Sequence, residues 1–153
     1  MSRRARWTAT LLGAILLAQG VGKLVSPGGY VSAFARFDAL PEPALWPVGI
    51  SWMAAELLCG AGLLYAGLAR APRRRLALAS AAGGLAVCLA YGVLNFRAYA
   101  SGRRVENCTC FGEHLPQRLS LFVLAQDAYM LVFAAWQTWK IHWWRAPLQG
   151  EEP

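Results

Sequence analysis

Two cysteines separated by a single residue form the pair most suited to chemistry in this chain, within the segment Cys108-Thr109-Cys110-Phe111-Gly112. Thiols this close can form a disulfide, but the small ring leaves little freedom for relaxed torsions. A strained, exposed disulfide is the labile kind that exchanges with other thiols, because strain raises its reduction potential. The pattern predicts thiol–disulfide exchange in which one cysteine attacks and the other resolves, and it leaves open which does which.

Two other interpretations of the cysteine pair remain open. The pair could be a static clip within its loop, or it could join His114 as three ligands for a soft ion such as Zn, Cu(I) or Hg. A closed zinc site needs four ligands and the segment 100–118 holds no further Cys or His, so we expect no metal centre. His114 is then either a solvated side chain or a base or cation that sets thiolate formation. Phe111 and Gly112 would supply a hydrophobic contact and a turn.

The elements that must position these cysteines are four long apolar runs in a chain that is 57% hydrophobic. Each run is close to the roughly 20 residues that cross about 30 Å of hydrocarbon. In lipid only helices and closed barrels satisfy the backbone polar groups, and the runs lack the alternation of barrel strands. We therefore predict an all-α fold, an integral membrane four-helix bundle forming a single domain over 1–153. The predicted helices cover residues 7–25, 46–68, 76–99 and 119–141.

The first run follows three arginines, as a signal peptide would, and Ala33-Phe34-Ala35 resembles a cleavage sequence. Its 19 residues exceed a typical signal core, and cleavage would leave an odd number of helices. We expect the run to be retained as a helix. The prolines and glycines of 26–45 predict an outer connection, with room for a short interfacial helix around Tyr30 to Phe37.

Basic residues in the short flanks predict the orientation, because they favour the cytoplasmic side. Nine lie on one side: Arg3, Arg4, Arg6, Arg70, Arg73, Arg74, Arg75, Lys140 and Arg145. Five lie on the other: Arg36, Arg97, Arg103, Arg104 and Arg118. The bias predicts both termini in the cytoplasm and the loops 26–45 and 100–118 outside a bacterial inner membrane. The cysteines would then face the periplasm or cell exterior, where disulfides persist.

The net charge of +7 does not require a nucleic-acid partner, because the predicted topology explains the main basic clusters. The run Arg73 to Arg75 is interpreted as a membrane anchor. Trp7, Trp46 and Tyr99 lie at predicted span ends, as interfacial aromatics do. We expect the lipid bilayer, and no nucleic acid, as the partner of these surfaces.

Polar and ionisable side chains inside the predicted helices form a second group: Lys23, Glu56, Asn95, Arg97 and Asp127. A lone charge at a helix centre costs about 2.5 to 3.5 kcal/mol, so these groups should face the bundle and pair. Two neutral pairs are available, Lys23–Glu56 with Arg97–Asp127, or the reverse assignment. The group would be a polar clamp for the bundle, or it would handle protons or a ligand beneath the cysteine loop and tune the thiol pKa values.

Two further cysteines lie inside the predicted helices. Cys88 recurs with the small residues Ser80, Gly84 and Gly92 at every fourth position, so we expect it to be structural, in a packing seam. Cys59 lies about one turn from the carboxylate of the second helix, on the same face, and its role stays open.

The chain resembles the MauE and DoxX group of small four-helix, redox-associated membrane proteins, and the methylamine utilisation family MauE is the closer match. The resemblance covers nearly the whole chain. It rests on four segments: Gly20-Val21-Gly22-Lys23-Leu24, Trp52-Met53-Ala54-Ala55-Glu56-Leu57-Leu58-Cys59-Gly60, the intact Cys108-Thr109-Cys110-Phe111-Gly112, and Leu119-Ser120 followed by Asp127.

This resemblance implies redox maturation outside the membrane, with Cys108 and Cys110 as catalytic thiols of a thiol–disulfide oxidoreductase. The implied partners are a thioredoxin-like protein of the MauD kind and an extracytoplasmic client such as the disulfide-rich small subunit of methylamine dehydrogenase. The DoxX side of the group implies an alternative, a noncatalytic membrane anchor or subunit of a quinone-linked redox complex. A quinone is then the implied cofactor, although the sequence itself requires none. A soft-metal carrier is a third hypothesis.

Overall fold

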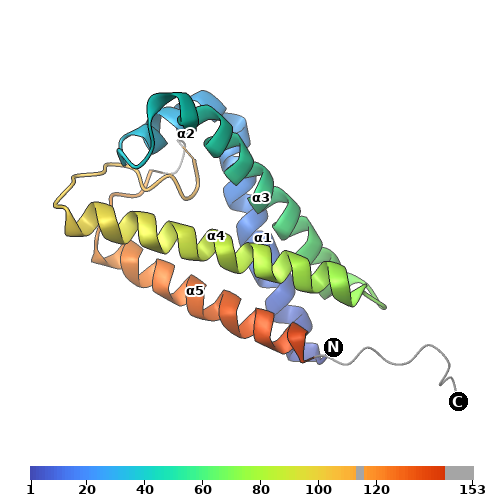
Figure 1. Ribbon diagram of the computed structural model, residues 1–153. Helices are drawn as coiled ribbons and strands as arrows, with labels where there is room; N and C mark the ends of the chain where they lie inside the picture. Colours follow the sequence, from blue (N-terminus) through green and yellow to red (C-terminus); the bar gives the residue numbers. More distant parts are fainter. Residues whose placement is uncertain (113–115, 144–153) are drawn as a thin grey trace, which may run out of the picture.

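The computed structural model describes residues 1–112 and 116–143, and within these ranges the chain forms helices and no strand. The five helices are α1 (Arg3–Val25), α2 (Pro27–Ala35), α3 (Glu42–Leu68), α4 (Arg74–Ala100) and α5 (Leu121–His142) (Figure 1). The predicted all-α class is therefore confirmed for the described residues. Each of the four predicted long helices corresponds to one of α1, α3, α4 and α5.

Three of these helices, α1, α3 and α4, are long and apolar enough to cross a membrane. In the described part of the chain α5 does not meet that measure, although it has 22 residues. Its sequence mixes apolar residues with Gln126, Asp127, Gln137 and Lys140. The three apolar helices are typical of a helical membrane protein.

Small residues let α1 and α3 approach closely. A Cβ atom added to Gly13 would lie 2.7 Å from the Leu64 nitrogen, and one added to Gly60 would lie 2.8 Å from the Leu17 nitrogen. Such close backbone contact is how helices associate where lipid removes the hydrophobic driving force. This contact fixes the position of α1 along the axis of α3. It therefore also sets which residues of α3 lie beside the last turn of α1.

The predicted small-residue seam on α4 is only partly used for packing. Ser80 meets Gly62 of α3, and Gly84 faces Leu16 and Leu63. Cys88 is buried in the same core, as a structural cysteine should be. A Cβ at Gly92 would meet nothing within 4 Å, so the outer end of this face opens into free space.

The short helix α2 covers one end of the bundle. It begins with Pro27 in its first turn, where the missing N–H costs nothing. Tyr30 and Phe34 of α2 are buried in a second apolar cluster that also includes Val105. The short helix predicted around residues 30–37 is therefore present, shifted by a few residues toward the N-terminus.

The molecule has two distinct ends (Figure 1). The N-terminus, the α3–α4 turn and the end of α5 lie at one end, where the Arg6 guanidinium donates to the Gly67, Leu68 and Ala69 carbonyls of the α3 terminus. The opposite end holds α2 and the residues 101–112, which carry the cysteine pair. Residues at the end of α1 are thus brought beneath the cysteine segment.

Candidate functional site

The cysteine pair lies in a loop whose backbone is held by its own polar groups. The Asn107 side chain accepts from the Thr109 N–H at 2.9 Å and donates to the Gly112 carbonyl at 2.9 Å. The Cys108 N–H donates to the Gln117 carbonyl at 2.8 Å, which joins the two arms of the loop. Asn107 thus closes a tight turn around Thr109 to Gly112, the turn that carries both cysteines.

Two residues of this turn adopt positive φ angles, Thr109 at 63° and Gly112 at 77°. A β-branched residue in this region is a genuine outlier, and such backbone strain concentrates at functional sites. The Thr109 hydroxyl is buried and has no hydrogen-bond partner among the described residues. The conformation is maintained by the surrounding contacts and not by the preference of Thr109 itself.

Gly112 and Gly22 allow the loop to touch α1 backbone against backbone. A Cβ at Gly112 would collide with the Gly22 carbonyl oxygen, and one at Gly22 would lie 2.5 Å from the Phe111 carbonyl oxygen. Two motifs of the sequence, one closing α1 and one in the loop, therefore meet in a single contact. Neither glycine can be replaced without separating the loop from α1.

Both cysteines are in the thiol form, with Sγ atoms 3.1 Å apart. This exceeds the roughly 2.05 Å of a disulfide bond. The Cys108 side chain is 1% exposed and that of Cys110 is 3% exposed. The expectation of an exposed pair is wrong for this state, because the turn folds inward and both cysteines are buried in the main apolar core.

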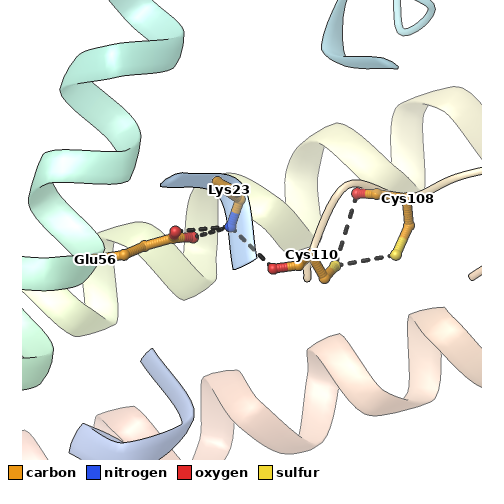
Figure 2. A network of polar contacts seen from close by, with 4 residues as sticks. All are labelled: Lys23, Glu56, Cys108 and Cys110. Atoms are coloured by element: carbon orange, nitrogen blue, oxygen red, sulfur yellow. Dashed lines mark hydrogen bonds and ion pairs between the residues drawn. The ribbon is translucent and has the colours of Figure 1, made fainter. Parts of the chain in front are cut away.

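Lys23 connects the loop to α3 through a fully buried ion pair (Figure 2). Its Nζ lies 2.7 Å from both carboxylate oxygens of Glu56 and donates to the Cys110 carbonyl at 2.9 Å. Both charged side chains have 0% exposure. The predicted pairing of Lys23 with Glu56 is confirmed, and the ammonium group uses its remaining donor to hold the cysteine turn.

Aromatic rings surround this ammonium group. Lys23 Nζ lies 5.5 Å from the ring centroid of Tyr30 and 5.1 Å from that of Tyr91, within the range of cation–π attraction. The Trp52 ring packs edge-on against Tyr91 with centroids 4.8 Å apart. The rings exclude water from the ion pair while offering the cation a favourable electrostatic surface.

A second buried polar pair joins α4 and α5. Asn95 Nδ2 donates to Asp127 Oδ2 at 2.7 Å, and both side chains are buried. The expected ion pair of Arg97 with Asp127 is wrong, since Arg97 is exposed and lies beside Asp38 and Arg103. Side chains two residues apart on a helix point in directions that differ by about 200°, so Asn95 and Arg97 cannot face the same neighbour. The structure shows that the residue facing Asp127 is Asn95.

The two thiols have pKa values shifted in opposite directions. The pKa of Cys108 is lowered, chiefly because the Cys110 thiol donates a hydrogen bond to the Cys108 thiolate. The pKa of Cys110 is raised well above its ordinary value by its hydrogen bond with Cys108 and by burial. Of the two thiols, Cys108 is therefore the one that ionises first.

The other residues expected at the site are distributed around the turn. Phe111 is half-buried and packs against the main core. Its backbone carbonyl lies against Gly22 of α1. His114 lies outside the described residues. Over residues 1–112 and 116–143, no group of three or more His, Cys, Asp or Glu side chains is placed to hold a metal ion.

The sequence profile of a family described as "Methylamine utilisation protein MauE" matches residues 1–140. The chain belongs to the MauE family. The match runs from α1 through nearly all of α5, so it includes Lys23, Glu56, the cysteine pair and Asp127. No curated protein and no solved structure shows significant similarity. The three apolar helices and the family together identify a membrane protein.

Proposed function

We propose that this MauE family member is a membrane thiol–disulfide oxidoreductase that supports oxidative maturation of an extracytoplasmic protein in methylamine utilisation. The observation that carries the proposal is the pair of reduced thiols 3.1 Å apart on a turn held in a strained conformation. Thiols at this distance need only a small movement to form a disulfide. The client that fits the family description is the small subunit of methylamine dehydrogenase.

The electrostatics of the pair support exchange chemistry. A thiolate is the attacking species in exchange, and the lowered pKa of Cys108 makes one available. A thioredoxin-like protein of the MauD kind is the proposed partner that carries electrons between the loop and the client. We place the loop on the periplasmic or extracellular side of the inner membrane, with both termini in the cytoplasm, as the basic residues favour.

Replacing both loop cysteines tests this function. In cells that produce methylamine dehydrogenase, Cys108→Ala with Cys110→Ala should leave the small subunit largely reduced, as measured by a gel shift after alkylation of free thiols. Cys59→Ala is the matched control, because that thiol lies away from the loop, beside Gly83 of α4. A fully oxidised small subunit in the double variant, with the protein present in the membrane, would reject the oxidoreductase.

A groove between α4 and α5 favours a second candidate function, a noncatalytic subunit of a quinone-linked complex. The groove has a volume of about 280 Å³ and contains one carboxyl group, that of Asp127, among apolar residues. Its apolar lining comprises Leu89, Gly92, Val93, Phe96, Leu124, Ala128 and Leu131. An isoprenoid quinone would place its ring at the carboxyl group and its tail along the apolar wall. In this alternative the cysteines only clip the loop.

A further inference from the structure

The two halves of the cysteine turn are held by different parts of the molecule. The Cys110 half is attached to α1, through the Lys23 ammonium on the Cys110 carbonyl at 2.9 Å and through the contact of Gly112 with Gly22. Lys23 is in turn fixed by both carboxylate oxygens of Glu56. A movement of Cys110 would therefore break a buried hydrogen bond to an ammonium group that the carboxylate of α3 holds in place.

The Cys108 half packs in the apolar core, but its hydrogen bonds go only to the loop. Its N–H donates to the Gln117 carbonyl at 2.8 Å, and its Sγ lies 3.8 Å from Gln117 Oε1. In the part of the chain that the structure describes, every hydrogen bond of Cys108 goes to another loop residue. Figure 2 shows the order Glu56, Lys23, Cys110, Cys108, with Cys108 farthest from the ion pair.

Neither sulfur is open to another protein in this state, since the two side chains are 1% and 3% exposed. Exchange requires the incoming thiolate to reach a sulfur along the axis of the breaking bond, so the turn has to open. We propose that Lys23 and Glu56 are positioning residues that hold Cys110 as the resolving thiol, and that Cys108 is the sulfur that exchanges with the partner. This inference rests on the oxidoreductase function proposed above.

The exchange balances within the two proteins. In the maturation direction, a partner thiolate attacks Cys108 of the loop disulfide, a partner–Cys108 bond forms, and the electron pair of the broken bond leaves on the Cys110 sulfur. The second partner thiolate then attacks the partner sulfur of this mixed disulfide and expels the Cys108 thiolate. Two electrons pass to the loop, the partner gains one disulfide, and its two protons end on the loop sulfurs or in water. In the reverse direction the Cys110 thiolate attacks the Cys108 sulfur of the mixed disulfide and expels the partner thiolate, which is its resolving role.

Limited alkylation of the reduced full-length protein tests the assignment without any partner. The protein in detergent is treated with less than one equivalent of iodoacetamide, and fragmentation mass spectrometry locates the modified cysteine. We expect Cys108 to react about tenfold faster than Cys110, because no clamp holds it and its pKa is the lower of the two. Preferential modification of Cys110 would overturn the assignment.

The positioning role is tested by removing the clamp. Lys23→Met with Glu56→Met removes both charges and the donor to Cys110 while leaving no unpaired charge. The preference for Cys108 should then fall to about twofold or less, because Cys110 is released. Gly22→Ala, which pushes the Phe111 carbonyl away, should act in the same direction and serves if the double variant does not fold. Lys140→Met is the matched control, a lysine at the other end of the molecule, and should keep the tenfold preference.

Trapping separates this inference from the function on which it rests. With Cys110→Ser, a thioredoxin-like partner should accumulate as a mixed disulfide on Cys108, whereas Cys108→Ser should trap little. Stronger trapping by Cys108→Ser would refute the assignment and leave the function standing. If neither variant traps a partner, the function fails, and the alkylation preference still decides whether the clamp distinguishes the two thiols. An unchanged preference in the clamp variants would reject the positioning role.

Discussion

Lys23 makes three polar contacts in a site with no exposure, two with Glu56 and one with the Cys110 carbonyl. A buried ion pair gains little stability over a well-packed apolar pair, because each charge loses its hydration. Removing one member alone leaves the other charge unpaired in an apolar environment. The main effect of this pair is therefore to fix the position of the cysteine turn, and not to add stability.

The energetic consequence at the residue scale is strong coupling between Lys23 and Glu56. Lys23→Met or Glu56→Met alone should lower the free energy of unfolding by about 3–5 kcal/mol, and the two substitutions together should cost much less than the sum. The measurement is a double-mutant cycle from reversible unfolding in mixed micelles. Additive losses would show that the two charges do not stabilise each other.

Two glycines near the C-terminal end of α1 show how one helix end serves two neighbours. Gly20 lies against Leu57 of α3, and Gly22 lies against the Phe111 carbonyl of the loop. Lys23, the next residue, reaches both α3 and the loop with its side chain. The Gly-x-Gly-Lys sequence is thus explained by packing on two sides together with one buried cation.

The α4–α5 pair leaves a groove because Gly92 has no side chain to fill it. Gly92→Leu should occupy the groove without disturbing the packing, since a Cβ there meets nothing within 4 Å. If the groove holds a quinone, the variant should retain several-fold less quinone after purification in mild detergent, as measured by solvent extraction and chromatography. Gly28→Leu is the matched control, a glycine of α2 with equally open surroundings. Equal quinone content in all three proteins would remove the quinone-linked alternative.

At the scale of the whole molecule, the basic residues and the two ends of the structure agree. The N-terminus and the α3–α4 turn share one end, which carries most of the arginines, and the cysteine loop lies at the other (Figure 1). An orientation with the arginine-rich end in the cytoplasm agrees with the rule that basic residues flanking membrane spans stay on the cytoplasmic side. All four long helices, including α5, would then cross the bilayer.

Reporter fusions test this arrangement. A fluorescent protein that matures only in the cytoplasm should be bright at the C-terminus, and alkaline phosphatase, which is active only outside, should be active when fused after Gly102. Both results follow from the bias of nine basic residues against five. A dark C-terminal fusion would show that α5 does not cross, and an inactive phosphatase would place the cysteines in the cytoplasm.

The sequence alone determined the helical class, the long helices and the family, and it limited the partner of Lys23 to Glu56 or Asp127. These features follow from local composition and from the high cost of a lone charge in lipid, neither of which depends on how the helices pack. The structure chose between the two partners of Lys23 and showed that Asn95, and not Arg97, faces Asp127. Both results depend on the direction in which each side chain leaves its helix as well as on its depth.

Only the tertiary structure decided that the cysteine turn is buried, that Gly22 and Gly112 touch, and that Lys23 holds the Cys110 carbonyl. The residues of this last contact are 87 positions apart in the chain. Their meeting depends on the depth of α1 against α3 and on the inward fold of the loop, which no local pattern encodes. The same packing makes the two cysteines unequal, although in the sequence they are a symmetric pair around Thr109.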